Sequence, residues 1–245
     1  MTIGSTPKSA ALHPGPGFRI THEVPRADRE VVAGLGAFET PEISDLLNRL
    51  YTMSPEIRAW TKPSLRVAGP ACTVKLFPGD NLMVHKALDV ALPGDVIVVD
   101  TSASSMTAVL GDLICTKARH RGIAGFVVDG LIRDVAQIRE LGDFPVFARG
   151  VTPIGPLHRG PGELNFPVCA GGVVVRPGDV VVGDLNGVAV VQREVAAELL
   201  SRLRAGQEAQ AEYARAVAEG RFSNAWVDEA LARSGLPVSE PLVRA

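Results

Sequence analysis

The sequence GDLICTKARHRGIAGFVVDGLIRD, residues 111–134, decides how this chain folds. Its first eleven residues are helical in composition, and Gly122 is a natural helix stop. Residues 123–128 then form a short apolar run that predicts a buried strand. Asp129-Gly130 is expected to turn the chain before a second short helix over residues 134–141. The stretch therefore predicts a helix, a strand and a helix in succession.

The two charged ends of this stretch are expected to meet. An eleven-residue helix is about 16 Å long, and a seven-residue strand is about 23 Å long. Because the turn at Gly122 sends the strand back alongside the helix, Asp112 comes level with Arg133 and Asp134. Open α/β sheets usually bind ligands at the edge beyond the carboxyl ends of their strands. This edge is therefore the candidate site.

Helices alternate with short apolar strands on both sides of residues 111–134. The expected helices cover residues 40–50, 81–92 and 194–220, with a further helical piece within 223–240, and the expected strands cover residues 65–76, 95–99, 144–148, 173–175, 180–182 and 188–191. Thr40 is the expected helix cap, and Gly69-Pro70 is expected to break the first strand. The last three strands are expected to form a β-hairpin region, with turns at Pro177-Gly178 and Asn186-Gly187. The alternation predicts a layered α/β fold.

The composition predicts that the chain has three parts, which differ in how well ordered they are. Residues 1–18 are rich in Pro, Gly, Ser and Thr without periodicity, which predicts a flexible N-terminal tail. Residues 19–200 show no change of composition and are expected to form one domain. Residues 201–245 are expected to form a helical C-terminal arm at a subunit interface.

The overall charge and the cysteines exclude several classes of protein. The chain has 245 residues and a formal net charge of −2. Proteins that bind nucleic acid or an anionic membrane usually carry a positive patch or net charge, so this charge does not indicate either kind of binding. Cys72, Cys115 and Cys169 lack metal-binding or disulfide spacing and fit buried thiols in a reducing compartment. No apolar run approaches about 18 residues, so no transmembrane helix is expected. A cytoplasmic protein is the resulting expectation.

The residues at the candidate edge could bind an anion beside a divalent cation. The first N–H groups of a helix, here those of residues 111–114, carry a partial positive charge, and Gly111 allows close approach. Arg133 offers a planar fork suited to a carboxylate. Asp112 and Asp134 could hold magnesium, which often uses one or two carboxylates and several waters. Together these groups would suit a 2-oxo acid whose keto oxygen faces the metal.

The same residues also fit a purely structural account. An Asp near a helix start, such as Asp112, commonly stabilises the helix dipole. Arg133 and Asp134 would then form a surface ion pair worth about 0–1 kcal/mol. The chemistry of the residues alone leaves both accounts open.

Residues 111–134 resemble the signature of the RraA-like family, which includes class II pyruvate aldolases acting on 4-hydroxy-4-methyl-2-oxoglutarate and 4-carboxy-4-hydroxy-2-oxoadipate. That signature is an Asp, twenty residues and then Arg-Asp, and Asp112 with Arg133-Asp134 matches it without a gap. The segments DNLMVHKALDVALPGDVIVVD (80–100) and GDVVVGDLNGVAVV (178–191) are also similar to family segments. The family includes, besides these aldolases, a regulator that binds and inhibits a ribonuclease.

The resemblance implies an α/β/β/α sandwich of the swivelling-domain type, assembled as a homotrimer or homohexamer with sites at subunit interfaces. It implies that Asp134 ligates Mg²⁺ or Mn²⁺, while Asp112 holds metal-bound waters and works with Arg133 in moving the proton. Arg133 would bind the pyruvyl carboxylate, helped by the main-chain N–H groups of Leu113 and Ile114 beside Gly111. The implied reaction is cleavage of a 4-hydroxy-2-oxo acid to pyruvate through its enolate, with decarboxylation of oxaloacetate by the same route.

The chain departs from these aldolases near its C-terminus. Those enzymes complete the site with an acidic residue from a neighbouring subunit, and this C-terminal sequence differs from theirs. Four residues are possible donors, namely Glu208, Glu212, Asp228 and Glu229. The substrate, and the alternative of a non-catalytic ribonuclease regulator, therefore stay open at this point.

Residues outside the signature could also contribute to the site. Asn81 and His85 are one helical turn apart near a predicted helix start, so they could line the pocket. A hydrogen-bonded structural role for His85 is the alternative. His158 shows no metal-binding spacing and is expected to be structural or on the surface.

Overall fold

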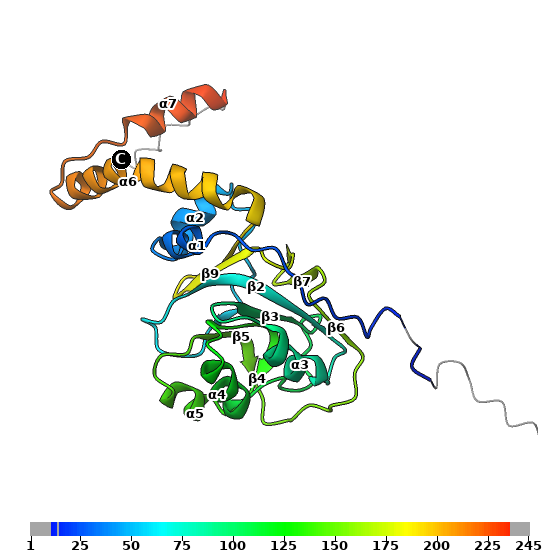
Figure 1. Ribbon diagram of the computed structural model, residues 1–245. Coiled ribbons are helices and arrows are strands. Elements are labelled where there is room, and N and C mark those ends of the chain that lie inside the picture. The colour runs from blue at the N-terminus through cyan, green and yellow to red at the C-terminus, as the bar shows by residue number, and fades with distance from the viewer. Residues whose placement is uncertain (1–10, 14, 236–245) are drawn as a thin grey trace, which may run out of the picture. The chain divides into compact units, whose positions relative to one another are not determined.

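The computed structural model describes residues 11–13 and 15–235 (Figure 1). Most of the predicted N-terminal tail, residues 1–10 and 14, lies outside the described residues. The chain divides into two compact units, residues 1–203 and 204–245. The described residues of each unit are considered separately below.

A parallel sheet forms the centre of the first unit. Four neighbouring strands run in the same direction: β2 (Val67–Leu76), β3 (Val96–Asp100), β4 (Gly125–Ile132) and β5 (Val146–Val151). The short strand β1 (Arg58–Ala59) pairs with β5 at one side. The two inner strands β3 and β4 are near-continuous runs of buried side chains, as expected for parallel strands covered on both faces.

Strand β2 joins this sheet to a second, antiparallel one. Its first residues pair with β9 (Val180–Asp184), which forms a hairpin with β10 (Gly187–Val191), while its later residues pair with β3 and with β6 (Gly162–Leu164). The two sheets therefore share one long strand and fold over each other. A separate ribbon of β7 (Val168–Ala170) and β8 (Val173–Val175) contributes to the apolar space between them.

Helices cover the two outer faces and complete four layers (Figure 1). Helices α3 (Leu82–Val90), α4 (Asp112–His120) and α5 (Val135–Glu140) share an apolar cluster with one face of the parallel sheet. Helices α1 (Arg29–Leu35) and α2 (Thr40–Leu46) and the start of α6 (Ala196–Ala218) share another with β9 and β10. A third cluster fills the space between the sheets. The predicted α/β/β/α sandwich with a C-terminal helix is confirmed.

Strand β4 differs from the prediction at Asp129-Gly130. We expected a turn there, but the strand continues to Ile132 through a register shift between Val128 and Leu131. The Asp129 carboxylate accepts a hydrogen bond from the Gly171 amide at 2.9 Å and pairs with Arg149, so buried polar contacts replace the turn. The extra length carries residues 133–134 to the sheet edge.

Three smaller expectations about the strands and caps are wrong. Strand β8 pairs with β7 and not with the strand that follows it. Strand β2 passes through Gly69-Pro70 without a break, and its pairing partner changes there from β9 to β3. A Cβ on Gly69 would lie 2.2 Å from the Gly94 carbonyl oxygen, so only Gly fits at this position. Helix α2 is capped by Glu39 with Glu42, while Thr40 binds the Asp184 carboxylate instead.

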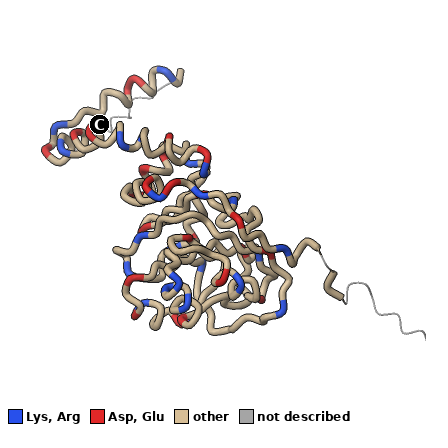
Figure 2. Tube along the Cα trace, in the orientation of Figure 1, with Lys and Arg blue, Asp and Glu red and all other residues tan. Residues whose placement is uncertain are grey.

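The second unit contains the rest of α6 and α7 (Ala225–Ser234). Acidic and basic residues are both distributed along it (Figure 2). Its side chains are mostly exposed, including the large apolar residues Tyr213, Phe222 and Trp226. The four acids considered as donors to a neighbouring site are all exposed, and Glu212 pairs with Arg215 at 3.2 Å. No helix among the described residues is long and apolar enough to cross a membrane.

Substitution of Phe147 would test the packing between the two sheets. It is fully buried, and its ring lies against Gly183 of β9. We expect Phe147→Ala to lower the free energy of unfolding by about 3–5 kcal/mol, because it leaves a cavity between the layers. The control Phe77→Ala removes the same ring from a site that is 58% exposed and should cost much less. Equal losses in denaturant unfolding would contradict the assigned packing.

Candidate active site

The start of α4 and the end of β4 are held together by backbone hydrogen bonds. The Val109 amide donates to the Leu131 carbonyl at 2.9 Å, and the Arg133 amide donates to the Leu110 carbonyl at 3.0 Å. The chain entering α4 therefore runs beside the chain leaving β4. This pairing brings the two ends of the 111–134 stretch together, as their lengths predicted.

Gly111 permits the closest approach at this junction. A Cβ at this position would lie 2.2 Å from Asp134 Oδ2 and 3.1 Å from Arg133 Cγ, so any larger residue would displace the carboxylate. Asp134 itself adopts a left-handed backbone conformation, with φ of 57°. Such a conformation is uncommon outside Gly, although Asp and Asn tolerate it better than most residues, and it often marks a functional site.

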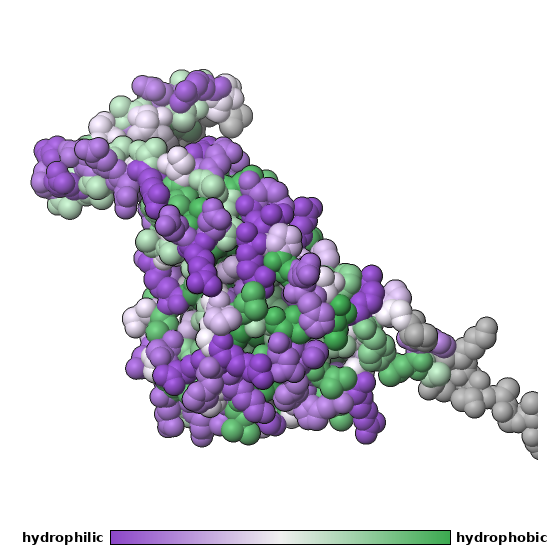
Figure 3. All heavy atoms as spheres, in the orientation of Figure 1, coloured by the Kyte–Doolittle hydropathy of each residue, from purple (hydrophilic) through white to green (hydrophobic). Residues whose placement is uncertain are grey.

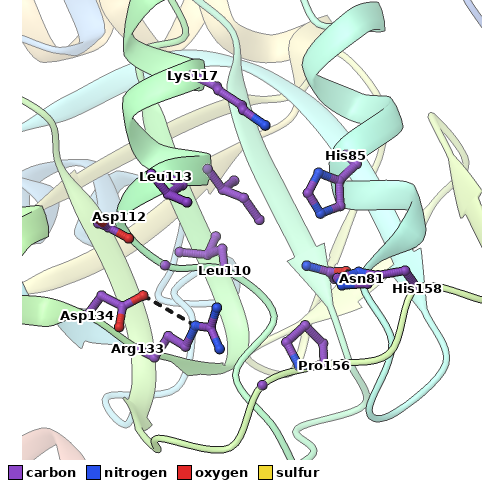
Figure 4. Close-up of a pocket in the computed structure, with 13 residues that line it drawn as sticks. Asn81, His85, Leu110, Asp112, Leu113, Lys117, Arg133, Asp134, Pro156 and His158 are labelled. Atoms are coloured by element: carbon purple, nitrogen blue, oxygen red, sulfur yellow. Dashed lines mark hydrogen bonds and ion pairs between the residues drawn. The ribbon is translucent and has the colours of Figure 1, made fainter.

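A cavity of about 290 Å³ opens at this junction (Figure 4). All six residues predicted to form the site line it, namely Gly111, Asp112, Leu113, Ile114, Arg133 and Asp134. The other lining residues are Asn81, His85, Leu110, Lys117, Gly155, Pro156 and His158. The structure thus brings the predicted residues into one space, while their individual roles remain predictions.

Arg133 reaches into the cavity from the end of β4 (Figure 4). Its Nε atom lies 3.3 Å from Asp134 Oδ2. A Cβ on Gly155 would lie 2.6 Å from Arg133 Nη1, so the absence of a side chain there leaves room for the guanidinium. Arg133 is 44% exposed, which leaves its remaining N–H groups available to a carboxylate ligand.

The negative charges of Asp112 and Asp134 both act on the buried Cys115 thiol. Burial, and then the charges of Asp112 and of Asp134, raise the pKa of the buried Cys115 thiol well above its usual range. A raised pKa means a less reactive thiol, so Cys115 is part of the core and not a nucleophile.

The donor set fits a hard divalent cation. The side chain of Asp112 is partly exposed, and Asp134 Oδ2 occupies the space that a side chain on residue 111 would fill. Among the described residues no group of three or more His, Cys, Asp or Glu is placed to hold a metal ion. A site with one or two carboxylates completed by waters is typical of magnesium.

The opposite wall of the cavity carries nitrogen-bearing side chains. Asn81 Nδ2 donates to the Val109 carbonyl at 2.8 Å, so its Oδ1 faces His158 Nδ1 at 2.6 Å. This arrangement requires the proton on His158 Nδ1. The ring of His158 packs edge to face against His85, with centroids 5.5 Å apart. Asn81 and His85 line the pocket, as the sequence suggested. His158 is exposed and hydrogen-bonded to Asn81, which agrees with the expected structural or surface position, and it also lines the pocket.

Five lining residues were not predicted as site residues from the sequence, namely Leu110, Lys117, Gly155, Pro156 and His158. Lys117 lies one turn beyond Leu113 on α4, so helical spacing from the predicted anion site could have identified it. His158 comes from the loop after β5 and reaches a residue 77 positions earlier in the chain. No local sequence pattern signals such a contact.

Burial and two neighbouring basic residues lower the pKa of His85. Burial lowers the pKa of His85 first, and the neighbouring His158 and Lys117 lower it further. His85 therefore stays neutral to a lower pH than an ordinary histidine, whose pKa is about 6.5. A neutral imidazole offers one N–H donor and one acceptor to a ligand.

Comparison with known proteins assigns the family. Residues 40–190 match the RraA-like family, described as Aldolase/RraA. The chain belongs to the RraA-like family. A protein of Halalkalibacterium halodurans named "Putative 4-hydroxy-4-methyl-2-oxoglutarate aldolase" is 39% identical over 182 residues, which cover 74% of this chain and 86% of that protein. A protein of the same name from Azotobacter vinelandii is 42% identical over 122 residues, covering 50% of this chain and 74% of that protein.

Solved RraA-like structures share the fold. A structure titled as Streptomyces coelicolor RraAS2, "an unusual member of the RNase ES inhibitor RraA protein family", superposes with a TM-score of 0.70 at 33% identity, covering 78% of this chain and 98% of that one. An uncharacterized protein from Pseudomonas syringae superposes with a TM-score of 0.71 at 28% identity, covering 81% and 96%. Family members named as aldolases and as ribonuclease inhibitors thus resemble the same domain.

The pKa of His85 tests the electrostatics of the cavity. We expect nuclear magnetic resonance titration to give a pKa below the ordinary value of about 6.5. Lys117→Ala should raise this pKa, because it removes one of the positive charges that disfavour the imidazolium. Lys86→Ala is the matched control, since Lys86 neighbours His85 in sequence but lies 3.9 Å from Asp89 as its ion-pair partner. No change in the Lys117 variant would contradict the arrangement.

Proposed function

We propose that this chain is a metal-dependent lyase that cleaves 4-hydroxy-4-methyl-2-oxoglutarate or a related 4-hydroxy-2-oxo acid to pyruvate and a second oxo acid. One observation supports the proposal most strongly. Arg133 and Asp134 lie against the N-terminus of α4 at Gly111, and all of them line one cavity. The names of the aldolase relatives support the reaction class. We also propose decarboxylation of oxaloacetate, because it passes through the same pyruvate enolate.

The pyruvyl end of the substrate would bind on the side of the cavity that Asp112, Arg133 and Asp134 form, which is the carboxylate wall. Its carboxylate would pair with the Arg133 guanidinium and accept hydrogen bonds from the first free amides of α4, at Leu113 and Ile114. The partial positive charge of the helix start favours this anion. The 2-oxo group would then face Asp112 and Asp134.

Cleavage requires one bond to break and one proton to move twice. The C4 hydroxyl loses its proton as the C3–C4 bond breaks, and C4 becomes the carbonyl carbon of the departing oxo acid. The electron pair of the broken bond stays with the three-carbon fragment, which is the pyruvate enolate. Return of a proton to C3 gives pyruvate. Asp112 and Arg133, through an ordered water, are the groups proposed to hold this proton.

Asp134, with Asp112 through waters, would hold Mg²⁺ or Mn²⁺. Such an ion supplies Lewis acidity that stabilises negative charge developing on the 2-oxo oxygen. Arg133 would contribute to the same charge stabilisation from the protein side. Gly111 contributes by leaving the Asp134 carboxylate the space it occupies.

We propose that the chain works as a homotrimer or homohexamer. Three large apolar residues beside the cavity are exposed, in the first turn of α4 and in the loop after β5: Leu113 at 71%, Ile154 at 57% and Leu157 at 57%. Apolar patches also interrupt the hydrophilic surface on the face shown in Figure 3. Exposed apolar surface of this kind favours association. Light scattering of the purified protein would measure the assembly.

A regulator that binds a ribonuclease is the second candidate, and the titles of related RraA structures favour it. Release of pyruvate from 4-hydroxy-4-methyl-2-oxoglutarate and from oxaloacetate separates the two candidates. The aldolase proposal expects turnover of the first substrate with Mg²⁺ or Mn²⁺, loss of turnover in EDTA and recovery on adding the metal back. A folded protein without metal-dependent turnover of either compound would favour the regulator.

Asp134→Asn tests the proposed metal ligand. Asn tolerates the left-handed backbone, so the fold should persist while one negative charge is lost. We expect kcat/KM for pyruvate release to fall on the order of 100-fold or more, with the circular dichroism spectrum unchanged. Asp143→Asn, which removes an exposed carboxylate paired with Arg119, should leave turnover near wild type. Wild-type turnover in Asp134→Asn would rule out the proposed role.

A further inference from the structure

A β-bulge interrupts β4 shortly before the residues of the carboxylate wall. The register between β4 and β5 shifts between Val128 and Leu131. Two residues of β4, Asp129 and Gly130, consequently face the single residue Arg149 of β5. A bulge of this kind bends its strand and increases the local twist, and bulges next to active sites often redirect a side chain. The direction in which β4 ends therefore depends on this bulge.

Three separate segments hold the bulge through polar contacts. The Asp129 carboxylate accepts a hydrogen bond from the Gly171 amide, in the turn between β7 and β8, at 2.9 Å. The same carboxylate pairs with Arg149 of β5. The Asp129 carbonyl accepts a hydrogen bond at 2.7 Å from the hydroxyl of Thr101, which directly follows β3. Both Asp129 and Thr101 are buried, so loss of a partner would leave a polar group unsatisfied.

The close fit at Gly111 makes the candidate site sensitive to where β4 ends. Asp134 Oδ2 lies 2.2 Å from the place that a Cβ on Gly111 would take. The Arg133 amide donates to the Leu110 carbonyl at 3.0 Å across the same junction. A misplacement of about 1 Å can lower a catalytic rate on the order of 100-fold. Small movements of the bulge would therefore be felt in the cavity.

We infer that Asp129 is a positioning residue for the proposed active site. Its carboxylate does not line the cavity. It holds the bulge that aims Arg133 and Asp134 at the N-terminus of α4. The inference rests on the proposed function and deepens it, because it makes the placement of the proposed metal ligand and of the proposed carboxylate-binding group depend on a buried acid outside the cavity.

Asp100 offers a matched control, because it makes the same kinds of contact without a bulge. It is the register partner of Asp129 on β3 and is also buried. Its carboxylate accepts a hydrogen bond from the Cys169 amide of β7 at 3.1 Å and pairs with Lys75 at 2.8 Å. The pairing of β3 with β4 is regular up to this position. If Asp129 only anchored the β7–β8 ribbon, both acids would have the same effect on the site.

Hydrogen exchange measured by mass spectrometry tests the positioning without metal or substrate. Asp129→Asn keeps the size of the side chain and removes its charge. We expect it to speed exchange of the Val109 and Arg133 amides about 10-fold or more, because both donate across the junction beyond the bulge. Asp100→Asn should leave these two amides near wild type. Unchanged exchange in Asp129→Asn, or equal acceleration in Asp100→Asn, would overturn the inference.

Thr101→Val keeps the inference testable if Asp129→Asn fails to fold. It removes the hydroxyl that donates to the Asp129 carbonyl and leaves the pairing of the carboxylate with Arg149 intact. The same two amides should again exchange faster. Thr73→Val is the control, since it removes a buried hydroxyl that donates to the Phe166 carbonyl away from the bulge. Equal exchange in the two threonine variants would contradict the role of the bulge.

Metal binding and turnover separate this inference from the proposed function. Mn²⁺ binding, followed by electron paramagnetic resonance, and kcat/KM for pyruvate release should each fall about 10- to 100-fold in Asp129→Asn. Asp100→Asn should keep both near wild type. Faster exchange in Asp129→Asn with unchanged Mn²⁺ affinity and turnover would refute the positioning role and keep the aldolase. A wild-type protein that neither binds Mn²⁺ nor releases pyruvate would refute the aldolase, and faster exchange in Asp129→Asn would still support Asp129 as the residue that places Arg133 and Asp134.

Discussion

The candidate site depends on one steric constraint, which is that a carboxylate oxygen of Asp134 occupies the space where a side chain would begin at Gly111. Backbone hydrogen bonds between residues 109–110 and 131–133 hold the two segments at this distance. Once they are fixed, the free amides of α4, the guanidinium of Arg133 and the carboxylates face a common space. An anion and a cation can then be bound side by side, because the helix start and Arg133 attract one while the carboxylates attract the other.

Much of the fold could be predicted because its signals are local. The apolar runs that became β3, β9 and β10 and the periodic segments that became α3, α4 and α6 are readable within a few residues. The errors arose where distant contacts override local preference. Asp129-Gly130 has the composition of a turn, but pairing with Gly171 and Arg149 keeps the chain extended. Strand β8 lies before a turn sequence, yet its partner precedes it in the chain.

The carboxylate wall of the site could be predicted because a single stretch supplies both of its ends. The length of a helix and the length of a strand suffice to bring Asp112 near Arg133 and Asp134, and the structure has them lining one cavity. The opposite wall could not be predicted in this way. It joins α3 to a loop that follows β5, and the Asn81–His158 hydrogen bond links residues with no shared pattern. Lys117 could have been predicted as a site residue, because it lies one helical turn after Leu113 on the same face of α4.

The two walls are carried by neighbouring helices, α3 and α4, which rest on one apolar cluster. Their buried side chains include Ala87, Cys115 and Ala118, and small residues of this kind allow helices to pack closely. The width of the cavity is consequently a property of the core beneath it. A methyl group gained or lost among these buried positions would change the space between the walls without altering any group that meets the ligand. Related chains with identical polar residues can therefore accept acids of different bulk, and comparing only their polar residues would miss the difference.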